Sequence, residues 1–415
     1  MTYLKRQLNK LFSNITETRP LVYLNGPRQV GKSTLAENIK TKKEINFVSF
    51  DSPLSLLAAK SDPVAFIASQ PRDALNIIDE VQKVPEVFSQ LKVAIDNARK
   101  SGRNESLYVL TGSTNIMAIP RLAKELVGRM SILTLLAFSS SEYEQTDKNF
   151  IESLWNDELS YKKYKDADLL DIISNSTFPE IMIHHKIDRI KWFDDYLTTI
   201  LQRDILILED IKNPESIIQL LVSLTQRVGS LLNNANVMKE VGLDAKTYNK
   251  YKTLTKNTFI ITEIEPWSKP NNLNKHFVKS SKIYFNDTNL LCYLMRKDLS
   301  EMYKDDLTVF GHIFENFIVT EILKNIKCLT GINVSHFNLS NGKEVDFVLE
   351  NAKGETIGIE VKLYKTLTSK DFTNMKLLHQ VSGEKFKKGI VVYTGNELVP
   401  FGGNMWAVPV NYLWE

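Results

Sequence analysis

The chain of 415 residues contains only two cysteines, and its formal net charge is only +3. Cys292 and Cys328 are too few for a disulfide framework or a four-ligand zinc site, which fits a reducing cytosol. No run approaches the roughly 18 consecutive apolar residues of a membrane span, and residues 1–20 lack the apolar core of a signal peptide. We therefore predict a cytoplasmic protein without a membrane partner. With so small a net charge, contact with nucleic acid would require a local basic patch.

The length of the chain exceeds one ordinary hydrophobic core, so we expect two to four domains of about 100–200 residues each. Glycine is absent from residues 142–210, where helix-forming residues dominate. An apolar stripe that includes Trp192, Tyr196 and Ile200 repeats there at helical spacing. This pattern predicts a helical lid or connector whose aromatic stripe belongs to the core.

The most specific signal is the run GPRQVGKS at residues 26–33, which fits the phosphate-binding pattern G-x-x-x-x-G-K-[ST]. It follows a strand-like apolar run and leads into a helix-like segment, as a working loop requires. Glycines let successive backbone N–H groups converge on phosphates, and the next helix directs its positive end at them. Lys32 would reach the β- and γ-phosphates, and the Ser33 hydroxyl would bind Mg²⁺. We predict ATP and Mg²⁺ as cofactors. The predicted nucleotide-binding residues are Gly26, Pro27, Arg28, Gln29, Val30, Gly31, Lys32, Ser33 and Thr34.

A second acidic element, Asp79 and Glu80, ends the strand-like run that begins at Ala74. In a P-loop fold, an Asp at this strand end holds the magnesium together with the loop hydroxyl, and Glu80 is placed to orient the attacking water. A third strand-like run leads into Thr111 and Ser113. Either side chain could contact the γ-phosphate or the water, and an ordinary turn is the alternative.

The strings GPRQVGKS, IIDEVQKVP, LTGSTN and ELVGR resemble the ATPase core of prokaryotic AAA-superfamily proteins that carry an uncharacterised C-terminal domain. The resemblance reaches across most of the chain and is densest between residues 21 and 129. It implies that the phosphate loop is Walker A and that Asp79 and Glu80 form Walker B. It also implies that Thr111 or Ser113 is the sensor residue.

The same resemblance implies that Arg129 stabilises the transition state. The chain has Glu-Leu-Val-Gly-Arg where family members usually have Ser-Leu-Ala-Gly-Arg, so an ordinary surface arginine is the alternative. The sequence leaves open whether Arg129 would act in its own subunit or across the interface of a homo-oligomer.

Residues 217–266 are typical of a winged-helix unit: two helix-like segments, a third helix that Asp244 can cap, and then a strand. Such a unit can direct its later helix at a DNA groove, and it can also serve as a protein-interaction module. The later helix carries the lysines Lys246, Lys250, Lys252 and Lys256. DNA is therefore a candidate partner.

The C-terminal part combines a helix-like segment that contains Glu315 with two strand-like runs around an Asn-Gly turn. Asp346 lies in the second of these runs. The next strand-like run contains Glu360 and Lys362, which alternation directs to one face.

A helix Glu, a strand Asp and an E-x-K on the next strand resemble the PD-(D/E)xK site of restriction-endonuclease-like folds, although Val345 stands where that motif has proline. The resemblance implies that Asp346 and Glu360 hold a divalent metal with help from Glu315, and that Lys362 stabilises negative charge. Three interpretations stay open: an active nuclease, a nuclease-like binding domain, or an ordinary cluster of charge pairs.

These patterns together predict an α/β protein with a P-loop AAA-type parallel sheet, followed by helical and winged-helix segments and a C-terminal restriction-endonuclease-like domain. The predicted boundaries are 1–145 for the ATPase, 146–212 for the connector, 213–300 for the winged-helix module and 301–415 for the last domain. The predicted function is ATP hydrolysis coupled to these modules, with DNA as the substrate or ligand. The alternatives are a nucleotide-dependent signalling or defence switch whose last domain is an inactive binding platform, and a protein-remodelling ATPase.

Overall fold

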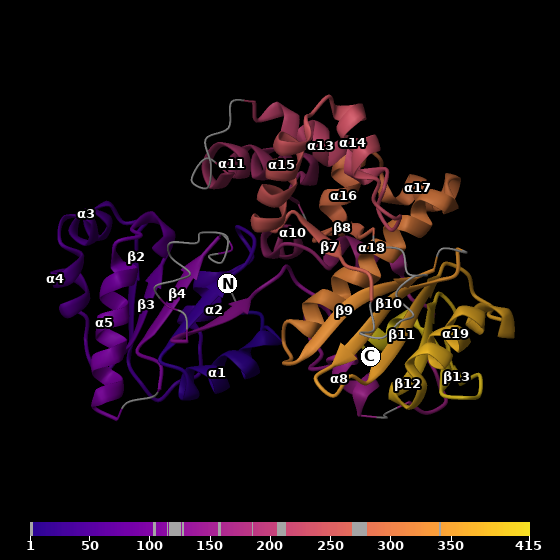
Figure 1. The fold of residues 1–415 in the computed structure, drawn as a ribbon, viewed down its shortest axis with the longest axis horizontal. Coiled ribbons are helices and arrows are strands. Elements are labelled where there is room, and N and C mark those ends of the chain that lie inside the picture. Colours follow the sequence, from indigo (N-terminus) through magenta and orange to yellow (C-terminus); the bar gives the residue numbers. More distant parts are fainter. Residues whose placement is uncertain are drawn as a thin grey trace.

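The structure is a computed structural model. It describes residues 3–102, 105–113, 115, 126, 128–156, 159–184, 186–205, 213–267, 280–339 and 342–415. Figure 1 shows the first sheet and its helices at the left, the helices of the middle region at the top, and a second sheet at the right. No helix among the described residues is both long enough and apolar enough to cross a membrane.

The first sheet has five strands in the order β2-β3-β4-β1-β5, and every neighbouring pair is parallel. Three of its strands are buried along their whole length, as expected for a parallel sheet with helices on its faces. The predicted AAA-type parallel sheet is therefore confirmed. The strands are β1 (Leu21–Asn25), β2 (Ile45–Ser49), β3 (Leu75–Asp79), β4 (Tyr108–Gly112) and β5 (Met130–Thr134), and the helices are α1 (Leu8–Thr18), α2 (Lys32–Glu37), α3 (Pro53–Ser61), α4 (Pro63–Ala68) and α5 (Val87–Lys100).

The middle region is helical apart from one antiparallel pair of strands. Its aromatic stripe is buried, and the rings of Trp192 and Tyr196 stack with centroids 5.1 Å apart. Asp244 caps α15 as predicted, because its carboxylate accepts from the amides of Lys246 and Thr247. The elements are α9 (Leu169–Asn175), α10 (Pro179–Ile183), α11 (Arg189–Thr199), α13 (Glu215–Thr225), α14 (Asn234–Val241), α15 (Ala245–Asn257), β7 (Ile261–Ile264), β8 (Lys282–Phe285), α16 (Thr288–Met295) and α17 (Leu299–Asp305).

The second sheet has seven strands in the order β6-β13-β14-β12-β11-β10-β9. It is mixed: β9, β10 and β11 pair antiparallel, whereas β11, β12 and β14 pair parallel. Its strands are β6 (Lys162–Lys163), β9 (Ile332–Asn338), β10 (Glu344–Asn351), β11 (Thr356–Lys362), β12 (Phe386–Tyr393), β13 (Glu397–Pro400) and β14 (Met405–Pro409), and its helices are α18 (Leu307–Ile326) and α19 (Thr373–Ser382).

The segment that follows the first sheet packs against this second sheet. It contains α7 (Ser140–Tyr143), α8 (Phe150–Trp155) and β6, and β6 pairs with β13. The hydroxyl of Thr146 donates to the Trp414 carbonyl over 2.7 Å, and Lys388 Nζ donates to the Leu154 carbonyl over 2.6 Å. The first part of the predicted connector therefore belongs to the layer around the C-terminal sheet.

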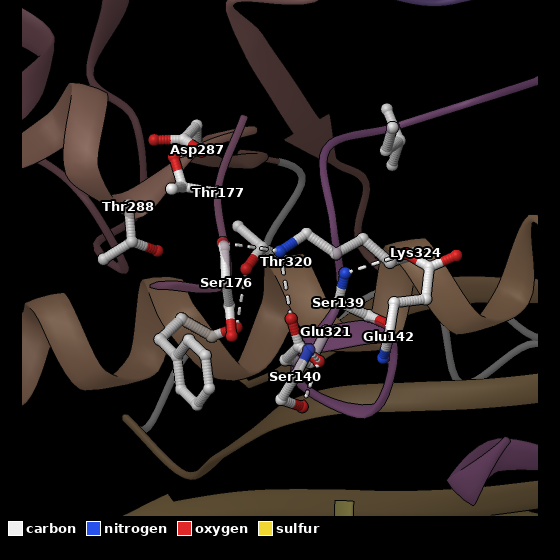
Figure 2. Close-up of polar contacts among 12 residues, drawn as sticks. Ser139, Ser140, Glu142, Ser176, Thr177, Asp287, Thr288, Thr320, Glu321 and Lys324 are labelled. Atoms are coloured by element: carbon white, nitrogen blue, oxygen red, sulfur yellow. Dashed lines mark hydrogen bonds and ion pairs between the residues drawn. The ribbon is translucent and has the colours of Figure 1, made fainter. Parts of the chain in front are cut away.

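Buried polar contacts join the segment around α7 to α18 (Figure 2). Lys324 on α18 donates to the carboxylate of Glu321 over 3.0 Å and to the carbonyl of Ser176 over 3.1 Å. Nearby, the guanidinium of Arg6 donates to Glu142 over 3.0 Å and to the Val30 carbonyl over 2.9 Å. The amide of Ser140 on α7 donates to Glu321 over 2.8 Å, so the backbone of the phosphate loop and helix α18 are linked through α7.

Candidate functional site

The predicted phosphate loop connects the end of β1 to the start of α2. Gly26 has a φ of 144°, and a Cβ there would lie 2.0 Å from the Leu135 carbonyl oxygen, so only glycine fits. Gly31 has a φ of 86° and is the residue before α2. Helix α2 therefore begins directly at Lys32, and its first amides face the loop.

The two Walker A side chains lie against Asp79 and the loop backbone. Lys32 is only 6% exposed, and its Nζ donates to the carbonyls of Gly26 at 3.1 Å and Pro27 at 2.7 Å. Ser33 Oγ donates to Asp79 Oδ1 over 2.7 Å. These contacts bring the ends of β1 and β3 together, as the parallel order of the sheet requires.

Asp79 lies at the centre of a hydroxyl cluster. Besides Ser33, it accepts from the Thr111 hydroxyl on β4 and from Ser49 Oγ on β2 over 3.0 Å. Oxygen donors of this kind fit Mg²⁺, which prefers carboxylates, waters and substrate phosphates as ligands. Ser49 was not singled out from the sequence, because its position became evident only when β2 paired with β3.

Glu80 is held by a neighbour that the sequence prediction missed. Its backbone has a φ of 55°, and its amide donates to Thr111 Oγ1 over 3.3 Å. Gln82 Nε2 donates to Glu80 Oε2 over 2.6 Å and to Ser113 Oγ over 3.4 Å. Thr111 therefore contacts Asp79 and Glu80 directly, and Ser113 is linked to Glu80 through Gln82.

These groups open onto a cavity of about 690 Å³, which is within the usual range for small-molecule sites. Residues 28–34 and Glu80 are among the residues that line it. Tyr3, Phe138 and Ile183 add apolar surface to the lining. The cavity thus combines the loop and an acidic side chain with apolar surface.

Arg129 lies at the amino ends of the parallel strands, whereas the phosphate loop lies at their carboxyl ends. Met130, the next residue, pairs with Leu21 at the start of β1, about 13 Å along the strand from Asn25 at roughly 3.3 Å per residue. The Arg129 guanidinium donates to both carboxylate oxygens of Asp96 on α5, over 2.7 and 2.9 Å. The guanidinium therefore does not face its own phosphate loop. Glu125 and Val127 of the same string lie outside the described residues.

Two of the acidic residues predicted in the C-terminal domain, Glu315 and Asp346, lie around a lysine that the sequence prediction missed, together with Glu344, which it also missed. Lys282 on β8 is 1% exposed, and its Nζ lies 3.8 Å from Glu315, 3.6 Å from Glu344 and 3.6 Å from Asp346. The Tyr284 hydroxyl, on the same strand, donates to Glu315 Oε1 over 2.6 Å.

The E-x-K pair lies beside this group. Lys362 Nζ is 2.7 Å from Glu360 Oε1, whereas the buried Glu360 Oε2 has no hydrogen-bond partner. The amide of Val361 donates to Asp346 Oδ2 over 2.9 Å, which fixes β11 against β10. Glu315, Asp346, Glu360 and Lys362 therefore share one neighbourhood, as their order along the chain predicted.

Burial dominates the electrostatics of this neighbourhood. Burial, reinforced by the charge of Asp346, raises the pKa of Glu315 to about 8. Burial also raises the pKa of Glu360 to about 7, against the opposing effect of Lys362. Among the described residues, no three His, Cys, Asp or Glu side chains are arranged to hold a metal ion. The acids surround an ammonium group instead.

Two of the four lysines of α15 are less available for contact with DNA phosphates than the sequence suggested. Lys252 and Lys256 both pair with Glu263 on β7, over 3.0 and 2.7 Å. Their charge is thereby partly neutralised within the module.

Three family models match successive parts of the chain. Residues 18–144 match an AAA domain, residues 166–301 a domain of unknown function (DUF8612), and residues 310–413 a domain of unknown function (DUF4143). The AAA match coincides with the five-stranded parallel sheet and its phosphate loop. Residues 18–144 therefore form an AAA-type P-loop domain.

The chain is also similar to uncharacterized proteins of Mycobacterium tuberculosis and Mycobacterium bovis. Each is 23% identical over 397 residues, which cover 95% of this chain and 81% of the relative. Among solved structures, the Walker-type ATPase of Pyrococcus abyssi is 13% identical with a TM-score of 0.40, covering 70% of this chain and 96% of that one. RuvB of Thermotoga maritima is 17% identical with a TM-score of 0.29, covering 61% and 85%.

Proposed function

We propose that this protein binds and hydrolyses ATP in the cavity formed by the phosphate loop and the ends of β1 and β3. The contact between Ser33 and Asp79, 2.7 Å, carries this proposal. It joins the proposed Walker A hydroxyl to the proposed Walker B carboxylate beside a cavity that Lys32, Ser33 and Glu80 line.

The chain's own residues have distinct roles in the proposed reaction. The amides of the loop and of the first turn of α2 bind the phosphates, and Lys32 adds the fixed positive charge. Ser33 and Asp79 would hold Mg²⁺, which neutralises charge on the transferred phosphoryl group when it is bound. Glu80 orients the attacking water, and the hydrogen bond from Gln82 fixes one of its oxygens.

We further propose that Arg129 acts on the nucleotide of a neighbouring subunit in a homo-oligomer. Its position at the far edge of the sheet supports this role, because Asp96 holds its guanidinium away from the loop of its own chain. An intermolecular role makes hydrolysis dependent on assembly.

The simplest test of the ATPase is Lys32→Ala. Removing the Lys32 ammonium group should reduce kcat/KM for ATP by at least about 100-fold, since one electrostatic donor to a developing charge commonly contributes that much. Lys60→Ala is the matched control, because Lys60 is exposed on α3 in the same domain. Unchanged ATP binding and turnover in Lys32→Ala would contradict the proposal.

A second candidate function is that the ATPase acts on DNA through the middle and C-terminal domains. The order of α18, three antiparallel strands, α19 and a parallel strand supports a nuclease-like fold, with the helix acid, strand acid and E-x-K in their expected order. Helices α13, α14 and α15 and the antiparallel pair of β7 and β8 support a winged-helix module. DNA that accelerates ATP hydrolysis would favour this function.

The same experiment separates the alternatives. If ATP changes the oligomeric state and DNA does not change the hydrolysis rate, a signalling or defence switch is favoured, with the C-terminal domain as an inactive binding platform. Incubation of the protein with single- and double-stranded DNA and Mg²⁺ or Mn²⁺ tests cleavage directly.

A further inference from the structure

We propose that Lys282 is an internal cation that takes the position of a divalent metal in the C-terminal acid cluster, and that removing it creates a divalent-cation site. The acid cluster is defined here as Glu315, Glu344 and Asp346. Two of the three expected metal ligands, Glu315 and Asp346, therefore lie against an ammonium group while β8 is in place.

The ammonium group of Lys282 lies near all three acids of the cluster. Lys282 Nζ lies 3.6–3.8 Å from one oxygen of each acid in the cluster. These distances exceed the roughly 2.7–2.9 Å of a charge-assisted hydrogen bond to a single partner. The lysine is therefore shared by three carboxylates from two different elements, α18 and β10, as a bound cation would be.

Strand β8 directs the Lys282 side chain toward the cluster. Residues two apart on a strand face the same side, so Lys282 and Tyr284 both point from β8 toward the cluster. The Tyr284 hydroxyl donates to Glu315 Oε1 over 2.6 Å, and a Cβ at Gly229 would lie 2.7 Å from Glu315 Oε2. Strand β8 and the turn at Gly229 thus enclose Glu315 from the side of the middle region.

Acidic side chains outnumber the cations in this cluster. Three of them surround one ammonium group, and the neighbouring Glu360 retains a buried oxygen with no hydrogen-bond partner. Without Lys282 the three acids would have no cation near them, and carboxylate oxygens are the ligand type that Mg²⁺, Mn²⁺ and Ca²⁺ prefer. A metal and Lys282 compete for the same position.

This arrangement has a functional consequence. Lys282 belongs to the strand pair of the middle region, whereas the acids belong to the C-terminal domain. Whether the C-terminal domain can take a metal therefore depends on whether β8 stays in place. Mn²⁺ binding at the cluster does not depend on ATP hydrolysis, so Lys32→Ala should leave it unchanged. The two proposals can therefore fail separately.

The test is Mn²⁺ binding to the full chain in the absence of nucleotide, followed by electron paramagnetic resonance. Lys282→Met should bind one Mn²⁺ per chain at least ten times more tightly than the wild type. Adding Asp346→Asn to that variant should abolish the gain. Lys388→Met is the matched control, because Lys388 is also a buried lysine, but its Nζ donates to the Leu154 carbonyl. This control should gain no site.

Two further measurements keep the proposal falsifiable if Lys282→Met is unstable. Lys282→Gln keeps a polar side chain of similar length, and Mn²⁺ should raise its melting temperature without changing that of the wild type. The wild type alone is also informative: a tight Mn²⁺ site that Asp346→Asn removes would show that metal and Lys282 coexist. That result, or folded Lys282→Met and Lys282→Gln proteins that bind no Mn²⁺, would overturn the proposal.

Discussion

The backbone amide and the hydroxyl of Ser140 both donate to the same carboxylate oxygen of Glu321, over 2.8 and 2.5 Å, although 181 residues separate the two in the chain. Glu321 is fully buried, and Lys324 completes its partners (Figure 2). Glu142, two residues after Ser140, accepts from Arg6, which also binds the phosphate-loop carbonyl of Val30. The nucleotide cavity and α18 therefore share one continuous buried network.

The first prediction concerns the stability of that network. Lys324→Met leaves the Glu321 charge buried without its cation and should destabilise the protein by about 3–5 kcal/mol. Combining it with Glu321→Gln removes the uncompensated charge, so the double variant should recover a large part of the loss. Thermal unfolding monitored by tryptophan fluorescence measures both. A double variant as unstable as the sum of the two single variants would contradict the pairing.

The second prediction concerns Glu80. Glu80→Gln keeps the shape and the contact with Gln82 but removes the carboxylate that orients water, so kcat should fall by about 10²–10⁴-fold. ATP affinity should stay close to that of the wild type, because Lys32 and the loop amides are untouched. Single-turnover hydrolysis and nucleotide titration check the two halves. If affinity fell while kcat stayed unchanged, Glu80 would contribute to binding only.

The third prediction tests whether Arg129 acts between subunits. Lys32→Ala and Arg129→Ala should each be inactive alone. When the two are mixed, a subunit with an intact loop can receive Arg129 from its Lys32→Ala neighbour, so ATPase activity should reappear. The control is a mixture of Lys32→Ala with itself at the same total concentration. A mixture that stays inactive while hetero-oligomers form would rule out action in trans.

The fourth prediction is a pH dependence of the C-terminal domain. The pKa of Glu315 rises from its ordinary value of 4.5 to about 8 on folding, because burial and Asp346 disfavour its charge. A carboxyl group whose pKa is raised in the folded state stabilises the fold fully below about pH 4.5, and this contribution is lost as pH rises toward 8. The melting temperature of the wild type should therefore fall as pH rises from 5 to 8.

Glu315→Gln supplies the control for that experiment. Its amide oxygen can still accept from Tyr284, but the side chain cannot ionise, so the decline of melting temperature with pH should be shallower. Equal slopes in the two proteins would show that Glu315 does not govern the pH dependence.

The sequence was most informative where the chemistry is local. Lys32 and Ser33 lie in one short motif. The second motif, Asp79 and Glu80, was predicted because the two carboxylates follow an apolar strand. Their meeting follows from parallel strands, whose carboxyl ends share one edge of a sheet. Gln82 lies two residues after Glu80 and could have been considered, since a polar side chain directly after Walker B is close enough to reach it.

Other features depend on contacts that no local pattern contains. The sequence around Lys282 shows only a lysine near a strand, and its contacts with α18 and β10 become evident only in the fold. The contacts of Arg6 with Glu142 and Val30 likewise depend on residues far away in the chain. The partner of Arg129 is Asp96 on a different element, so the sequence could not exclude a role at its own nucleotide. The two-residue strand β6 was not predicted, because so short a run has no periodicity.

Strand β6 and helices α7 and α8 have a consequence for how the protein is made. They precede the middle region, yet their partners lie near the C-terminal end of the chain: β6 pairs with β13, and Lys163 lies opposite Glu397. At roughly 5–20 residues per second, the nascent chain waits about 10–50 seconds after β6 emerges before β13 is synthesised. During translation, the apolar side of α8 must therefore be kept from aggregating while its docking surface does not yet exist. A fragment that begins after the middle region would lack these elements and would not reproduce the folded domain.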